Sequence, residues 1–167
     1  MTNMKTAEGK FIQVGPDGVI SEGDFALKRP GRVYFDYDEP TPLRIIADGF
    51  WVAVENYDIK STDRYPLSET PLSILLAEKP DFTGSDYKIT FEEHADHYKV
   101  HASDPNAPKQ GTISLVFTNN PIAIKSWVTT DAQGLKTVIT LQNVRLNVPV
   151  ASKLFYIENN IPSRKTY

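Results

Sequence analysis

The sequence predicts a mainly β protein, an antiparallel barrel or sandwich with one short helix in the middle of the chain. Apolar and polar residues alternate with a period of two along almost the whole chain, which is typical of strands with one buried face. Turn residues such as Gly15-Pro16-Asp17-Gly18 and Asp48-Gly49 recur roughly every ten residues. One segment, 70–77, has helical spacing instead.

The alternation predicts about eleven strands, each with one apolar and one polar face. Residues such as Lys28, Arg44 and Glu55 fall on the polar face. In chain order, the apolar faces contain Phe25 and Leu27; Val33, Phe35 and Tyr37; Leu43, Ile45 and Ala47; Phe50, Val52 and Val54; Tyr87, Ile89 and Phe91; Ile113, Leu115 and Phe117; and Leu135, Ile139 and Leu141.

Three places depart from this alternation. Trp51 and Trp127 are out of register with their apolar neighbours. We expect these two side chains on the outer face or at a rim, the alternative being that they pack under a loop or against another layer. Near Val144 to Val148 the apolar positions shift by one, which predicts a β-bulge.

The helix is expected to begin after Thr70, a suitable N-cap, with Pro71 in the first helical position. Leu72, Leu75 and Leu76 then share one face. A sheet with a continuous apolar face must cover that face or curl around it. The helix therefore either plugs the concave side of a strongly curved sheet or caps one end of an ordinary barrel.

Arg29 lies on the apolar face of its strand, directly before Pro30. One interpretation is an ordinary strand-end arginine that extends to solvent. The other is functional: the five N–H donors of the guanidinium reach carbonyl groups of the loop or helix that closes a cavity. In that case Arg29 is a latch, which holds the cover closed and releases it when a ligand enters.

Length and composition exclude several classes of protein. At 167 residues the chain is expected to form a single domain, 1–167. A net charge of -3, without a basic cluster, argues against nucleic-acid binding. The absence of cysteine excludes disulfides and cysteine-based chemistry. No apolar run approaches the ~20 residues that cross a bilayer, and the first residues do not form a signal peptide.

The candidate catalytic and metal-binding residues are weak. His94, His97 and His101 are close in sequence, but a hairpin expected between them places them in solvent, so we expect no metal and no other cofactor. Asp36 and Asp38 share a strand face, but it is the polar one. Phosphate-binding loops, nucleophile elbows and zinc-protease motifs are absent, and the histidines show no sign of a serine–histidine–acid triad. We therefore expect no enzymatic activity.

Four segments resemble a known family. They are LKRPGRVYFDYDEPTPLRIIADG (27–49), ETPLSILL (69–76), LVF (115–117) with IKSWVTTDAQG (124–134), and the closing Leu154-Phe155. In this order they resemble the LolA family of periplasmic outer-membrane lipoprotein carriers, and the similarity runs from about Met4 to Ile157. The resemblance implies a strongly curved, incomplete antiparallel β-barrel, a helical lid on its concave side and a C-terminal Leu-Phe strand.

The resemblance also implies a function. The protein is expected to be a periplasmic monomer that takes lipoproteins from an inner-membrane ABC-type release complex and delivers them to the outer membrane, through a receptor or directly. The lid would consist of the arginine at Arg29 and a helix with Pro71, Leu72, Leu75 and Leu76. The apolar faces supply the expected acyl-chain cavity, lined by Phe25, Leu27, Val33, Phe35, Tyr37, Leu43, Ile45, Val52, Val54, Ile113, Leu115 and Phe117.

Members of this family have a longer N-terminal helix before the segment that matches 5–11. We therefore expect either a trimmed lid or a shortened family member here. Two other functions remain open from the residues. One is a binding protein for another lipid or a glycolipid on the same fold, and the other is a purely structural β-domain with a filled interior.

Overall fold

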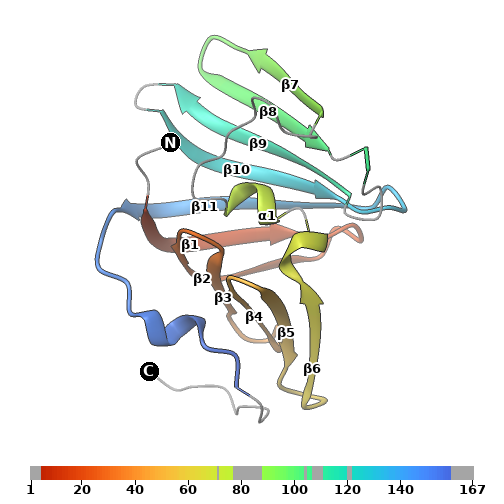
Figure 1. Cartoon of the computed structure of the whole chain (residues 1–167), viewed down its shortest axis with the longest axis vertical. Helices are drawn as coiled ribbons and strands as arrows, with labels where there is room; N and C mark the ends of the chain where they lie inside the picture. Colours follow the sequence, from red (N-terminus) through yellow and green to blue (C-terminus); the bar gives the residue numbers. More distant parts are fainter. Residues whose placement is uncertain are drawn as a thin grey trace.

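The computed structural model describes residues 5–70, 72–76, 88–103, 105–106, 111–119 and 122–158. Within these residues it shows one antiparallel sheet of eleven strands in the order β6-β5-β4-β3-β2-β1-β11-β10-β9-β8-β7 (Figure 1). The strands are β1 (Thr6–Val14), β2 (Ile20–Lys28), β3 (Arg32–Tyr37), β4 (Leu43–Asp48), β5 (Trp51–Asn56), β6 (Ser61–Pro66), β7 (Lys88–Glu93), β8 (His97–Ser103), β9 (Thr112–Asn119), β10 (Ile122–Thr130) and β11 (Lys136–Leu146).

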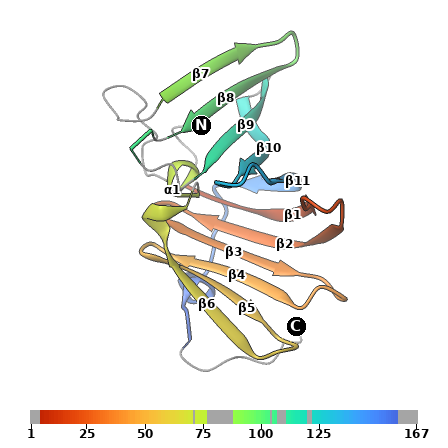
Figure 2. The ribbon, with the colours of Figure 1, turned by 90° about the vertical axis from the view of Figure 1, so that its right-hand side faces the viewer.

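Strands β6 and β7 form the two edges of this sheet, and Figure 2 shows the other strands fanning between them. The sheet is therefore open, and the prediction of an incomplete antiparallel barrel of about eleven strands is confirmed. One contact between distant strands shows that the sheet is strongly curved. The rings of Phe35 on β3 and Trp127 on β10 lie 6.2 Å apart, although four strand spacings, roughly 19 Å in a flat sheet, separate these strands.

The predicted turns connect neighbouring strands. Gly18, at φ +79°, completes the β1–β2 turn. The Asp48 carboxylate accepts hydrogen bonds from the N–H groups of Phe50 and Trp51 in the β4–β5 turn. Phe50 consequently belongs to an exposed turn, and its expected place on the apolar face of a strand was wrong.

Two bulges reset which side chains face the concave side. The predicted bulge in β11 is present, where Asn143 adopts φ +53° and the register with β1 shifts. An unpredicted shift between Ile124 and Ser126 makes Lys125 an extra residue in β10. One extra residue reverses the face of every later side chain. Trp127 therefore points to the concave side and is only 2% exposed, so its expected position on the outer face or a rim was wrong.

The main hydrophobic core lies on the concave face, but a second, smaller core lies on the outer face of β2 to β5. There Tyr34 and Ile46 pack against Phe155 and Ile157 of the C-terminal segment. The C-terminal Leu-Phe pair belongs to a 3-10 turn, η3 (Ser152–Phe155), so the strand implied by the resemblance was wrong. Because this segment covers part of the outer face, that face is not uniformly polar.

Arg44 on β4 and Glu55 on β5 are buried polar residues on the same outer face. Their side chains are 2% exposed and form an ion pair of 2.6 Å. The two residues lie on the face of their strands that the alternation predicts, opposite the concave side. That face was expected to be polar and exposed, but at this position it is buried. Asp36 on β3 is half-buried, whereas Asp38 is exposed.

The edge strand β7 shows the opposite deviation. Phe91 was expected on a buried apolar face, and the structure leaves it 70% exposed. Its strand pairs with β8 on one side and is the edge of the described sheet on the other, so few neighbours are available to cover the ring.

The helical segment is short. A 3-10 turn, η1 (Leu67–Glu69), precedes α1 (Leu72–Leu75), and Figure 1 shows α1 between the two halves of the curved sheet. The hydroxyl of Thr70 donates to the carbonyl of Leu67. Pro71 and Ala77, at the expected ends of the helix, and the side chain of Leu75 lie outside the described residues.

Candidate functional site

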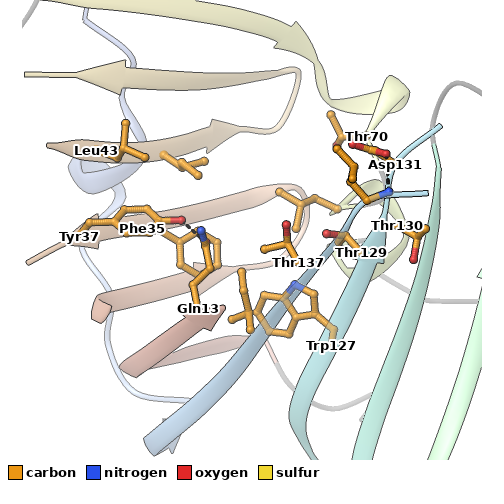
Figure 3. Close-up of a pocket in the computed structure, with 14 residues that line it drawn as sticks. Gln13, Phe35, Tyr37, Leu43, Thr70, Trp127, Thr129, Thr130, Asp131 and Thr137 are labelled. Atoms are coloured by element: carbon orange, nitrogen blue, oxygen red, sulfur yellow. Dashed lines mark hydrogen bonds between the residues drawn. The ribbon is translucent and has the colours of Figure 1, made fainter. Parts of the chain in front are cut away.

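The concave side contains an unfilled cavity of about 380 Å³ (Figure 3). This volume lies within the range of small-molecule sites, about 300–1,000 Å³. The described residues that line the cavity are Gln13, Phe35, Tyr37, Leu43, Ile45, Thr70, Leu72, Trp127, Thr129, Thr130, Asp131, Leu135, Thr137 and Ile139.

Two distant parts of the sheet form the walls of this cavity. Strands β3 and β4 supply an apolar wall that includes Phe35 and Ile45. Strands β10 and β11 supply the facing wall, with Trp127 and Ile139 deep in the trough and threonines toward the hairpin that joins the strands. The cavity therefore has an apolar body and one polar end.

Aromatic rings form a rigid base beside the cavity. Phe11 contacts Phe35 and Tyr37 edge to face, with ring centroids 5.1 and 4.9 Å apart. The Tyr37 hydroxyl donates to the Gln13 side-chain oxygen over 2.5 Å. Burial raises the pKa of Tyr37 far above its ordinary value, so this hydroxyl remains a donor at any physiological pH.

The η1–α1 segment covers the cavity. Leu72 lines it, and Leu76, only 1% exposed, packs into the concave core. The N–H of Gly31 donates to the Leu76 carbonyl over 2.8 Å, which ties the end of the cover to the β2–β3 turn. Gly31 has φ +74°, and a Cβ there would lie 2.8 Å from the Gly49 Cα atom, so this position requires glycine.

Arg29 lies two residues before this tie and is 7% exposed. The arginine therefore does not extend into solvent, and the interpretation of an ordinary strand-end side chain was wrong. Burial lowers the pKa of its guanidinium from the ordinary value. A buried cation of this kind requires polar partners to offset its desolvation.

The residues predicted to line a cavity all face the concave side, but they divide into two groups. Phe35, Tyr37, Leu43 and Ile45 line the open cavity. The others pack around it, most of them in the concave core cluster: Phe25, Leu27, Val33, Val52, Ile113, Leu115 and Phe117, with Val54 half-buried beside Ile45 on the neighbouring strand. Whether these residues bind a ligand stays a prediction.

Sequence reasoning missed the polar end of the cavity and Trp127. Thr129 and Thr137 are directly paired across β10 and β11, two residues along from the Trp127–Ile139 pair. Thr129 fell in the polar register because the bulge at Lys125 was not recognised, whereas Thr137 shares the apolar register of Leu135 and Ile139 but is itself polar. A second slip in the alternation, between Ile124 and Trp127, was the available signal.

A serine–histidine–acid arrangement, of which the sequence showed no sign, is present on β7 to β9. The Nδ1 atom of His101 lies 2.7 Å from the Ser114 hydroxyl, and its Nε2 atom contacts Glu92. Glu92 is exposed, and Ser114 belongs to an interior strand whose N–H groups are used in the sheet. Because acyl transfer needs free N–H donors for the oxyanion, this arrangement is a surface hydrogen-bond chain.

In the described part of the chain, no three His, Asp or Glu side chains are placed to hold a metal ion. None of its helices is both long and apolar enough to cross a bilayer.

Comparison with known proteins gives three concordant results. The family model for the outer membrane lipoprotein carrier protein LolA matches residues 2–158. The chain is 27% identical to the outer-membrane lipoprotein carrier protein of Coxiella burnetii (strain CbuK_Q154), over 98% of this chain and 80% of that protein. It is 28% identical to the protein of the same name from Halorhodospira halophila, over 93% and 76%.

A solved structure shares the fold. An uncharacterized conserved protein from Thermus thermophilus aligns with 98% of this chain and 91% of its own, with a TM-score of 0.54 and 8% identity. The family match spans nearly the whole chain and agrees with the open, curved sheet. The chain therefore belongs to the LolA family of outer membrane lipoprotein carrier proteins.

Proposed function

We propose that this protein is a monomeric periplasmic carrier that holds the acyl chains of lipoproteins on the concave side of its sheet. It receives them from an inner-membrane ABC-type release complex and delivers them to the outer membrane, through a receptor or directly. The observation that carries the proposal is the 380 Å³ cavity with an apolar body beneath the η1–α1 cover. Membership of the LolA family supports the same role.

The physical need for such a carrier comes from the acyl chains. Each CH₂ group that enters water costs about 0.8 kcal/mol, so a lipoprotein with two or three long chains does not cross an aqueous gap unaided. A carrier must nevertheless bind moderately, because it has to release its cargo. A cover that occupies the empty site competes with the ligand and lowers its apparent affinity.

The η1–α1 segment is suited to this role. Leu72 and Leu76 fill the space beside the cavity, and the hydrogen bond from Gly31 to Leu76 holds the segment in place. Arg29 lies buried at the start of the same turn, so we assign it as the latch for the cover. The Arg29→Leu variant is expected to fold and to bind lipoprotein, but to transfer it poorly because the empty, closed state is weakened.

Two measurements test the proposal. Mass spectrometry of ligands that co-purify with the protein identifies the cargo: an acylated peptide supports a lipoprotein carrier, whereas a free lipid or glycolipid supports the alternative binding protein. Release of lipoproteins from inner-membrane vesicles, with the wild type and Arg29→Leu compared, tests transport. Normal handover by the Arg29→Leu variant would refute the latch, and absence of release by the wild type would refute the carrier.

A further inference from the structure

The wall of the cavity formed by β1, β10 and β11 contains hydrogen-bonding groups that the protein itself does not use, from Trp127 in the trough to the threonines at the polar end. The indole Nε1–H of Trp127 is buried and has no hydrogen-bond partner among the described residues. A buried donor without a partner is destabilising, so native proteins rarely leave one in place without a reason. Figure 3 shows this nitrogen on the side of the ring that faces Thr137.

Gln13 adds a second group of donors. Its side-chain oxygen accepts the hydrogen bond of Tyr37, which fixes the orientation of the amide. The two N–H donors of that amide then remain for other partners. Gln13 pairs with Ile139 on β11, and Ile139 pairs with Trp127 on β10, so these three side chains form one row across the concave face.

The threonines form the next row. Thr129 and Thr137 are cross-strand partners, two residues from Trp127 and Ile139 on the same face. Both line the cavity, and among the described residues neither hydroxyl makes a side-chain hydrogen bond. Together with the Trp127 and Gln13 groups they form a patch of neutral donors beside an apolar cavity.

The charge at this end is negative. Of the described residues that line the cavity, Asp131 alone carries a charge, and one of its oxygens accepts hydrogen bonds from the N–H groups of Gln133 and Leu135 in the turn. A phosphate group here would find no lysine or arginine among these residues, and it would be repelled by the carboxylate. A neutral carbonyl oxygen would find donors without this repulsion.

We propose that this patch, which we call the carbonyl subsite (Gln13, Trp127, Thr129 and Thr137), binds the ester or amide carbonyls that join acyl chains to the ligand, and discriminates against phosphate-bearing lipids. The inference rests on the proposed function, because it requires that acyl chains occupy the cavity. It adds that the site recognises the linkage as well as the hydrocarbon. Phospholipids carry the same ester carbonyls, so selection of an acylated peptide over the phospholipids of the donor membrane would come from the Asp131 carboxylate, which repels their phosphate group.

The test compares three probes on the full chain. The first is a fluorescent peptide with a diacylglyceryl cysteine. The second is phosphatidylglycerol, which has the same acyl chains and competes with the peptide. The third is diphenylhexatriene, a hydrocarbon without any carbonyl. We expect the wild type to bind the peptide at least tenfold more tightly than phosphatidylglycerol. The Thr129→Val/Thr137→Val variant keeps the shape of both side chains while removing two donors, so it should lower peptide affinity about tenfold and leave diphenylhexatriene binding unchanged. Trp127→Phe removes the indole N–H together with part of the ring, so it should lower peptide affinity by more than diphenylhexatriene affinity.

Two further variants complete the test. Thr140→Val, a matched change on the outer face of β11, should leave all three affinities unchanged. Asp131→Asn, which retains an acceptor for the turn, should strengthen phosphatidylglycerol binding several-fold. Two results would overturn the carbonyl subsite while leaving the proposed function intact. One is an equal loss of affinity for the peptide and for diphenylhexatriene in the variants that remove donors. The other is wild-type affinity for phosphatidylglycerol as high as for the peptide. If the wild type bound none of the probes, the proposed function would fail, and the subsite with it.

Discussion

The Leu76→Ala variant tests whether the η1–α1 segment is a movable cover or a fixed part of the core. Leu76 is 1% exposed within the concave core and directly follows α1. Full burial of a leucine side chain contributes about 1.5–3 kcal/mol. If the η1–α1 segment opens for the ligand, truncation to alanine weakens closure by about 2 kcal/mol. The apparent affinity for a hydrocarbon probe should then rise roughly tenfold to thirtyfold, because closure competes with binding.

The matched control is Leu115→Ala. Leu115 is equally buried in the same core, but it lies on the interior strand β9 rather than on the cover. Its truncation is expected to lower the free energy of unfolding by about 2–5 kcal/mol and to give no comparable gain in affinity. Titration with diphenylhexatriene measures the affinities, and urea unfolding followed by tryptophan fluorescence measures the stabilities.

The affinity of the Leu76→Ala variant decides the question. A folded variant that binds the probe no better than the wild type would show that Leu76 is a fixed part of the core. The competition between cover and ligand would then have no structural basis at this residue.

Three other predictions concern stability. Glu55→Gln should destabilise the fold by about 3–5 kcal/mol in urea unfolding, because it leaves the Arg44 guanidinium buried without its counter-charge. The double variant Arg44→Met/Glu55→Leu, which removes both charges, should come close to the wild-type stability. Similar losses of stability in the two variants would contradict this account. Gly31→Ala should cost at least about 1–2 kcal/mol of unfolding free energy, since its φ is +74°, and an unchanged melting temperature would argue against the strain. The hydrogen bond from His101 lowers the pKa of Glu92 below 4.5, so this pair stabilises the β7–β8 hairpin above that pH and its contribution is lost as the pH falls through the lowered value. The protection factors of the hairpin amides, which correct for the intrinsic pH dependence of hydrogen exchange, should therefore fall on acidification in the wild type. A Glu92→Gln variant whose protection factors fall by the same amount would contradict the assignment.

Much of the fold follows from local properties of the chain. The period of two places Val33, Phe35 and Tyr37 on one face whatever the rest of the protein does, because successive strand residues point to opposite sides. The turn at Asp48-Gly49 is local in the same way, since the aspartate accepts hydrogen bonds from the residues that follow it. These signals were sufficient for the strand number, the position of the helical segment and the direction of the apolar faces of β2, β3 and β4.

Trp127 shows where local reasoning failed. Its face depends on one extra residue in β10, and the sequence offers several positions at which a bulge would restore the pattern. Pairing with β9 selects one of these positions for the bulge. The polar end of the cavity was missed for the same reason, because Thr129 changes face together with Trp127.

The sequence by itself determined the strands, their turns and, apart from Trp127, the main apolar residues on the concave side, because each depends on neighbours a few positions away. Tertiary structure alone decided that Arg44 and Glu55 are buried, because alternation assigns a residue to one face of a strand and does not show whether that face is exposed to solvent. It also decided which apolar residues border open space and which are packed. That division depends on the curvature that brings β3 and β10 together, and curvature is a property of the whole sheet rather than of any one strand.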